Sequence, residues 1–270
     1  MCIRDSYQTV AHGADTIQFF QLRRSVGGCE KFHGAVIAHA GTADTRVFCE
    51  VTQLGKELEK IGSRVMGSEN HAKVGIIFDW ENYWALEYTS GPNRDLRYVD
   101  QIEQMYNYFY NKNIAVDMIP IDADFSKYDL VAAPVLYMVK DGVAESLEAY
   151  VQAGGTLITT YMSGIVGQSD NVHLGGYPGP LRKMAGVWVE EIDALAPEQR
   201  NKIRFADGTE EECRLVCDLM HLEGAEEIAQ YENDFYAGMT AVAKNQFGKG
   251  TVYYVGTDLS ESGLAKVLAM

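Results

Sequence analysis

"YDLVAAPVLYMVKDGVAESLEAYVQAGGTLITTY", residues 128–161, carries two kinds of hydrophobic pattern in succession. It begins and ends with short apolar runs, YDLVAAPVLYMV and TLITTY, which have the length and the β-branched content of buried strands. The segment VAESLEAYVQA between them has the spacing of an amphipathic helix, and Gly154 and Gly155 follow where that helix would stop. Two strands joined by a helix in this way form a parallel βαβ unit.

The same alternation extends to both sides of this unit. Upstream, KVGIIFDW (73–80) and AVDMIPI (115–121) have the pattern of strands, and DLRYVDQIEQMYNYFYNKN (95–113) that of an amphipathic helix. Downstream, close-set strands separated by turns predict antiparallel edge strands or a small β-layer, and SESGLAKVLAM (260–270) begins a last helix. We therefore expect a doubly wound, mostly parallel α/β sheet.

Residues 7–66 form a separate, shorter pattern. YQTVAHGA resembles the end of a helix, and DTIQFFQLRR (15–24) has the apolar and aromatic content of a short buried strand. DTRVFCEVTQLGKELEKIG (44–62) is an amphipathic helix whose start Thr42 or Asp44 can cap. One such unit cannot cover both faces of a parallel strand, so we expect it to belong to a larger α/β structure.

The domain organisation follows from these patterns. MCIRDS (1–6) resembles the translation of a sequencing adapter, and we expect it to be an artefact rather than part of the natural chain. The remaining sequence divides into residues 7–66, a linker at 67–72, a second domain at 73–258, and a C-terminal segment at 259–270 that could itself be truncated.

Composition excludes several classes of function. A formal charge of −15 argues against binding along a nucleic-acid backbone, and no apolar run is long enough to span a membrane. The N-terminus lacks the apolar core of a secretion signal, so we expect a cytoplasmic protein. The five cysteines, with no C-x-x-C spacing, favour reduced thiols over a zinc site; they are Cys2, Cys29, Cys49, Cys213 and Cys217.

The second domain resembles the class I glutamine amidotransferase-like, flavodoxin-like fold. Active members of that fold place a cysteine at a sharp elbow after a strand, with a histidine and a carboxylate completing a triad. Here the elbow falls at Tyr161 or Met162, and neither is a nucleophile. Ser163 is nearby, but it has no evident histidine and aspartate partners. We therefore expect this domain to have a structural role.

Two further segments have the composition of binding surfaces. FDWENYWALEY (78–88) is predicted to expose Trp80, Trp84 and Tyr88 in a loop after a strand, which favours a protein interface or a platform for a sugar. GQSDNVHLGGYPGPLRKMAGV (167–187) is either a binding loop, a crossover ordered by its own turns, or a segment packed on a neighbouring subunit.

The most specific segment is QFFQLRRSVGGCEKFHGAV (18–36). In this order it resembles glycoside hydrolase family 42, the bacterial β-galactosidases. Two further segments, DWENYWALE (79–87) and GKGTVYYVGTDL (248–259), resemble the domain that follows the catalytic barrel in that family. The resemblance covers nearly all of the chain after residue 6.

This resemblance implies a particular architecture. Residues 7–66 would be the C-terminal βα portion of a TIM barrel, and residues 73–258 an amidotransferase-like domain that has lost its triad and mediates homotrimerisation. A TIM barrel needs roughly 250 residues, so most of it would lie outside this chain. Both catalytic glutamates would then lie upstream, and no residue here inherits a catalytic role.

The resemblance also assigns substrate-binding residues. Glu30 and His33 align with side chains that bind galactose hydroxyls, and Phe20 with an aromatic wall of the galactose pocket. Without the resemblance, a salt bridge from Glu30 to Arg23 or Arg24 would be the preferred interpretation. No cofactor or metal is expected; some members of the family carry a structural zinc, in a part that this sequence does not contain.

The leading hypothesis is therefore a fragment of a retaining β-galactosidase that is inactive alone. A stand-alone oligomerisation module is the main alternative, and an amidotransferase-like hydrolase that uses Ser163 is a weaker one. The sequence leaves open the linkage preferred, the natural galactoside and the organism.

Overall fold

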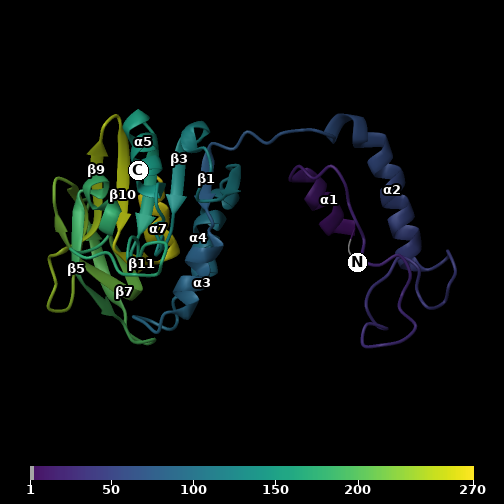
Figure 1. Ribbon diagram of the computed structural model, residues 1–270, viewed down its shortest axis with the longest axis horizontal. Coiled ribbons are helices and arrows are strands. Elements are labelled where there is room, and N and C mark those ends of the chain that lie inside the picture. Colours follow the sequence, from purple (N-terminus) through teal and green to yellow (C-terminus); the bar gives the residue numbers. More distant parts are fainter. Residues whose placement is uncertain (1–2) are drawn as a thin grey trace. The chain divides into compact units, whose positions relative to one another are not determined.

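A computed structural model describes residues 3–270 of the protein. Met1 and Cys2, the first residues of the segment expected to be an artefact, lie outside the described residues. The chain divides into two compact units, Met1–His71 and Ala72–Met270 (Figure 1).

The first unit contains two helices, α1 (Ile3–Ala11) and α2 (Arg46–Val65), as the sequence predicts. The expected cap of α2 is wrong, because its N-cap is Thr45, whose side chain makes no capping hydrogen bond. The Thr42 hydroxyl instead donates to the Asp44 carboxylate, so neither of these side chains is directed at the helix.

The strand expected at residues 15–24 does not form. Arg23 makes an isolated parallel bridge to Ile37, and the rest of the segment is irregular. A β-strand is stabilised by hydrogen bonds to neighbouring strands, and the neighbour that this unit supplies is limited to the residues around Ile37. The expected burial is wrong as well, because none of residues 15–24 is buried and Phe20 and Leu22 are exposed. Strand formation and burial both depend on partners that a local pattern does not reveal.

The second unit contains a mixed sheet of 11 strands. Ten of them follow the order β11-β7-β6-β8-β9-β10-β4-β3-β1-β2, and β5 pairs with β7 outside this order. Its parallel half confirms the predicted alternation of strands and helices. The parallel strands are β1 (Val74–Ile77), β2 (Val116–Ile119), β3 (Leu130–Ala133), β4 (Thr156–Thr160) and β10 (Gly250–Val255). The helices of this half are α3 (Trp80–Tyr88), α4 (Tyr98–Asn111) and α5 (Val143–Ala153).

The antiparallel half continues the same sheet, because β9 pairs antiparallel with β10. The predicted edge strands are thus confirmed, and they do not form a separate layer. They are β5 (Val187–Ala194), β6 (Asn201–Phe205), β7 (Glu210–Leu222), β8 (Glu226–Tyr231), β9 (Thr240–Phe247) and β11 (Thr257–Leu259). The chain then forms the expected last helix, α7 (Glu261–Leu268).

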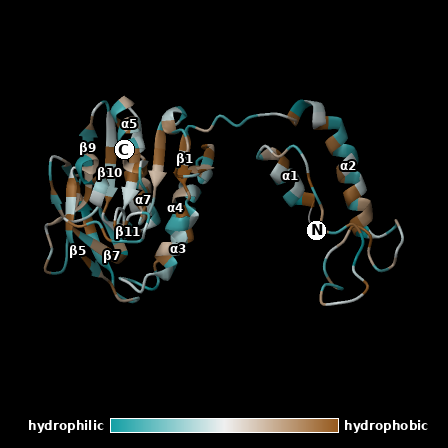
Figure 2. Cartoon of the chain, in the orientation of Figure 1, coloured by the Kyte–Doolittle hydropathy of each residue, from teal (hydrophilic) through white to brown (hydrophobic). Residues whose placement is uncertain are grey.

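Two clusters of buried apolar side chains stabilise the second unit. One contains Ile76, Ile158 and Val255, and the other contains Ile77, Leu157 and Tyr254. Neighbouring residues of one strand thus fall in different clusters, as expected of a sheet buried on both faces. Figure 2 shows the corresponding hydrophobic colouring along β1.

Residues 80–88 form a helix, α3, and not the predicted loop. The Asp79 side chain caps it by accepting a hydrogen bond from the Asn82 amide at 3.1 Å. The apolar residues of this segment were interpreted as a surface cluster because two tryptophans and two tyrosines dominate it. The helix-start signal, aspartate before the first turn with Glu81 inside it, was present in the sequence and was missed.

Asp218 of β7 gives the second unit a pH-dependent stability. Its side chain is 1% exposed, and burial raises its pKa to about 7, although the Tyr254 hydroxyl donates to Oδ2 at 2.7 Å. Because this pKa lies above the ordinary 3.8, Asp218 favours folding when protonated. That contribution is complete below about pH 4 and is lost as the pH rises through about 7.

We expect Asp218→Asn to remove about 3 kcal/mol of the pH dependence between pH 5 and pH 8, since asparagine has no carboxylate to ionise and about two pH units of the raised pKa fall in this range. Urea unfolding at pH 5 and pH 8, compared between wild type and variant, measures the difference. Asp207→Asn is the control: the hydrogen bond from Lys266 lowers the pKa of this exposed carboxyl to about 2, so its effect falls below this pH range. Equal pH dependence in wild type and Asp218→Asn would contradict the prediction.

Candidate functional site

The predicted galactose-binding residues lie on a loop that backbone hydrogen bonds close at its base. Val36 donates to Gln21 at 3.1 Å, Ile37 donates to Leu22 at 2.8 Å, and Arg24 donates to Ile37 at 3.0 Å. Since each of these bonds joins the two ends of one segment, residues 25–35 form a loop with fixed ends.

A hydrogen bond from His39 stabilises the first residue of this loop. The His39 ring donates from Nε2 to the Ser25 carbonyl at 2.9 Å, and the Ser25 hydroxyl lies within hydrogen-bond distance of the Gln21 amide group at 3.2 Å. Ala35 is buried at the end of the loop. The loop is therefore attached by its own backbone and by short polar side chains.

Glu30 and His33 come together on this loop. The His33 Nδ1 atom lies 4.0 Å from the Glu30 carboxylate, and the His33 amide donates to the Glu30 carbonyl at 2.9 Å. About half of each side chain is exposed to solvent, 57% for His33 and 50% for Glu30. A carboxylate acceptor and an imidazole, which can donate a hydrogen bond, thus stand side by side and open to solvent.

Phe20 stands at the start of the same segment, one residue before the hydrogen bonds at its base. Its ring is 74% exposed, although phenylalanine is ordinarily buried. The peptide bond that joins Phe20 to Gln21 is cis. The structure thus leaves the aromatic ring available for contact with another group.

The alternative interpretation of Glu30, a salt bridge to Arg23 or Arg24, is not what the structure shows. Within residues 3–270, the ionic neighbour found for the Glu30 carboxylate is His33. The Nε atom of Arg24 is buried without a hydrogen-bond partner in the described part of the chain. Neither arginine therefore explains the position of Glu30.

The second unit contains the predicted elbow. Met162, just after β4, has a φ of +56°, a left-handed conformation that is uncommon for a side chain of this kind. The expected elbow at Tyr161 or Met162 is thus confirmed at Met162, and a buried methionine occupies the position that a nucleophile would need.

Ser163 is unsuited to act as a nucleophile in place of Met162. It is completely buried, its hydroxyl oxygen accepts from the Leu136 amide at 3.0 Å, and the Thr159 hydroxyl donates to it at 2.9 Å. Because these bonds tie the elbow to the neighbouring strands, Ser163 has a structural role.

A cross-link at the carboxyl ends of the parallel strands was not predicted. Lys140 donates to Asp79 at 2.8 Å and also pairs with Glu81, and the fully buried Asn82 donates to Val135 at 3.0 Å and accepts from Met138 at 2.8 Å. These groups fix α3 to the segment after β3. Their sequence separation of more than 50 residues left no local signal.

Residues 167–187 are ordered by their own turns and by one strong ion pair. Arg182 donates twice to the Glu223 carboxylate, each bond at 2.6 Å, and once to the Gly175 carbonyl. A short helix, α6 (Arg182–Ala185), ends the segment. Turns within the segment and this ion pair to Glu223 therefore both order it, and the three interpretations of its role stay predictions.

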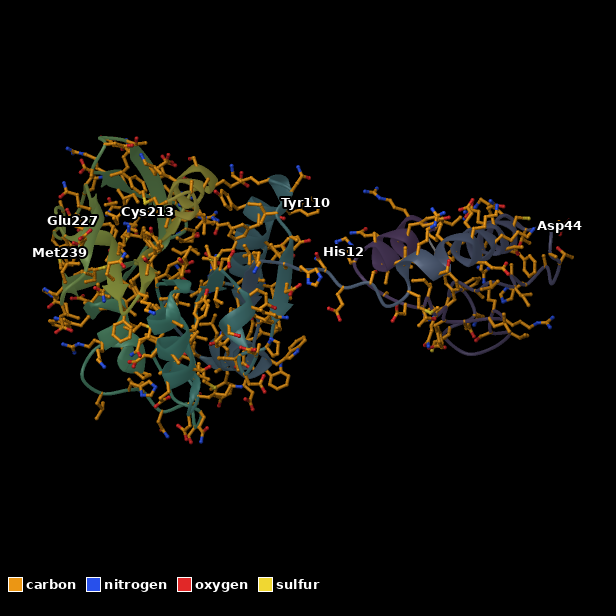
Figure 3. The ribbon with its side chains drawn as sticks, turned by 90° about the horizontal axis from the view of Figure 1, so that it is seen from above. His12, Asp44, Tyr110, Cys213, Glu227 and Met239 are labelled. Carbon is orange, nitrogen blue, oxygen red and sulfur yellow. The ribbon has the colours of Figure 1, made fainter. Side chains whose placement is uncertain are left out.

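The cysteines lie apart from any metal-binding cluster in the described residues. Cys213 and Cys217 are buried on β7, and Cys29 and Cys49 are exposed. Figure 3 shows Cys213 among the strands of the second unit. The hydrogen bond that the Cys213 thiol donates to Cys217, together with burial, raises the pKa of Cys213, which keeps this thiol protonated. Over residues 3–270, no group of histidine, cysteine and acidic side chains has an arrangement that could hold a metal ion.

Among residues 3–270, no helix has both the length and the apolar character needed to cross a bilayer.

Comparison with known proteins places both units in one family. A family profile described as β-galactosidase trimerisation domain matches residues 72–270, and a profile described as β-galactosidase matches residues 1–61. The chain belongs to the glycoside hydrolase family 42 β-galactosidases. It is 53% identical over 97% of its length to the β-galactosidase LacZ of Lactobacillus acidophilus, and 49% identical over 97% to the β-galactosidase BgaB of a Geobacillus strain.

Solved structures agree with these sequence matches. The crystal structure of the β-galactosidase from Bacillus circulans superimposes with a TM-score of 0.94 at 49% identity, and the match covers 98% of this chain. The chain covers less than half the length of each of these proteins: 39% of the two curated relatives and 40% of the crystallised one.

Proposed function

We propose that this chain works as the C-terminal part of a cytoplasmic bacterial β-galactosidase that hydrolyses terminal β-D-galactosides with retention of configuration. The observation that carries the proposal is the order of the two family matches, β-galactosidase at residues 1–61 and trimerisation domain at 72–270. In this proposal residues 7–66 end a TIM barrel, 67–72 are a linker, and 73–258 form an amidotransferase-like domain.

The exposed apolar side chains of the first unit support its place in a larger barrel. Leu22, Val26 and Phe32 are exposed along with Phe20, although side chains of this kind stabilise a domain by being covered. Contact with further strands and helices of a barrel would cover part of this surface.

In the assembled enzyme, Glu30, His33 and Phe20 bind the galactosyl unit. The Glu30 carboxylate accepts hydrogen bonds from two sugar hydroxyls, His33 donates to a third, and the Phe20 ring covers the apolar face of the pyranose. Retaining hydrolysis needs an acid/base and a nucleophilic carboxyl group about 5–5.5 Å apart. We assign neither role to a residue of this chain and place both upstream.

The second unit assembles the enzyme into a homotrimer. Its elbow carries Met162 where an amidotransferase needs a nucleophile, and Ser163 is fully engaged in structural hydrogen bonds. A domain with this fold and without a nucleophile is suited to a structural use. The description of the matching family names trimerisation, which supports an assembly of three copies related by cyclic symmetry.

A stand-alone oligomerisation module is the second candidate, and the compactness of Ala72–Met270 favours it. The reading frame upstream of Tyr7 distinguishes the two. A continuous frame that encodes about 300–400 further residues supports the enzyme, because that length completes a barrel with insertions. A stop codon there supports the module.

The chain by itself is expected to leave a chromogenic β-galactoside unhydrolysed. Neither proton transfer nor nucleophilic attack has an assigned group in it. The purified 270-residue chain is incubated with the substrate and compared with a blank without protein. Turnover above the blank that Glu30→Gln abolishes would show that a catalytic group has been misassigned.

A further inference from the structure

The exposed aromatic side chains of α3 form one stripe. Trp80, Trp84 and Tyr88 are four residues apart, so they lie above one another on the same side of the helix, over a length of about 12 Å. They are 58%, 60% and 86% exposed. The Trp80 and Trp84 rings are in contact, with centroids 6.1 Å apart. We refer to these three side chains as the α3 stripe.

The rest of α3 is held firmly by buried residues, and the Trp80 ring also packs on Phe78 and Tyr83 of the same unit. Asn82, Ala85 and Leu86 are buried on the other side of the helix, and the Asn82 side chain is hydrogen-bonded to both Val135 and Met138. A large aromatic surface on a fixed helix loses little conformational entropy when a partner covers it.

We infer that the α3 stripe is a contact surface between copies of this chain in the trimer, an inference that rests on the proposed trimeric assembly. The exposed parts of the three rings amount to roughly 400 Å², about half of the ~800 Å² that each partner contributes to a stable interface. Tryptophan and tyrosine are the residues that most often dominate the affinity of such interfaces.

The charge of the chain favours a contact of this composition. Each copy carries a formal charge of −15, so copies repel each other, and association must come from neutral surface. Lys140 pairs with both Asp79 and Glu81 at the start of α3, which reduces the charge of this group from −2 to −1. The stripe therefore presents apolar area beside carboxylates that have a partner within their own chain.

A sugar is a poorer match for this surface. The Trp80 and Trp84 rings are tilted by 38° and stand on a convex helix, whereas a sugar platform needs a flat ring bordered by directed polar groups. The cavity of about 340 Å³ between α4 and α7, which has amide side chains suited to polar ligands, is lined by other residues.

The test uses the full 270-residue chain and sedimentation velocity over a thousandfold range of concentration. We expect Trp84→Ala and Tyr88→Ala to raise the concentration at which trimers dissociate at least about tenfold each. Tyr110→Ala is the matched control: this tyrosine is also exposed, and it projects from α4 (Figure 3). It should leave the dissociation concentration within about twofold.

Each outcome decides something. A wild-type trimer that both α3 variants leave intact overturns the inference and leaves the trimer itself standing. A wild-type monomer at all concentrations overturns the trimer and the inference together. Trimers that persist in the variants, with tryptophan fluorescence that changes on addition of lactose, would show that the stripe binds a sugar instead.

Salt provides a second, independent readout. If an apolar stripe joins copies that repel by charge, raising the salt from 50 to 500 mM should strengthen the trimer, since screening removes the repulsion. Weaker association at high salt would mean that ion pairs hold the copies together, and would contradict the assignment of the α3 stripe.

Discussion

Replacement of Glu30 by alanine in an assembled enzyme is expected to lower kcat/KM for a β-galactoside about a hundredfold. The carboxylate is half-exposed and is free of any arginine partner in the described residues, so it is available for two sugar hydroxyls. Each lost hydrogen bond from a buried hydroxyl costs about 1–3 kcal/mol, and bonds of this kind tighten in the transition state.

The measurement uses a chimera in which residues 7–270 replace the matching segment of Lactobacillus acidophilus LacZ. The two sequences are 53% identical over 261 residues. Glu30→Gln keeps one acceptor oxygen, so its kcat/KM should fall less than that of Glu30→Ala. Glu59→Ala removes an exposed glutamate on α2 and should have no effect. If Glu30→Ala retained the kinetics of the unmodified chimera, the loop would be structural and the assignment of Glu30 would be wrong.

Gly164→Ala is expected to destabilise the second unit by at least about 4 kcal/mol. Gly164 has a φ of +63°, and an added Cβ would lie 2.0 Å from the Pro178 carbonyl oxygen and 2.4 Å from its carbon. Both obstacles are backbone atoms, so no change of rotamer relieves them. A loss of this size is a large fraction of the stability of an ordinary domain.

Tryptophan fluorescence during urea unfolding isolates this effect, because all three tryptophans, Trp80, Trp84 and Trp188, belong to the second unit. Gly208→Ala is the matched control: its φ is +85°, but nothing lies within 4 Å of the added Cβ. It should cost only the backbone strain, about 1 kcal/mol. Equal losses in the two variants would mean that the contact with Pro178 is unimportant.

The parallel half of the sheet was predictable because its signals are local. Strands β1, β3 and β4 are short apolar runs that are largely buried. Helices α4 and α5 have an apolar stripe, and α5 has an evident stop at Gly154. The sequence around residues 15–24 had the same apolar composition, yet it forms no strand, because strand formation depends on distant neighbours. Helix α3 was missed because its exposed tryptophans obscured the capping signal of Asp79.

The candidate sugar site was predicted only through the resemblance to a family. Local chemistry alone favoured a salt bridge between Glu30 and an arginine, and the structure pairs Glu30 with His33. No local pattern could indicate that Lys140 would reach back to Asp79, since contacts across 61 residues depend on the completed fold. The elbow was predictable to within one residue because it follows directly from the end of β4.

The β-galactosidase activity of the chimera tests the central claim most directly. If residues 7–270 are the C-terminal part of such an enzyme, the chimera should hydrolyse a chromogenic β-galactoside within about tenfold of the rate of the parent, since 53% identity preserves the fold on which the site depends. The parent without this segment should be inactive. A chimera that folds and assembles like its parent but shows no hydrolysis would contradict the account.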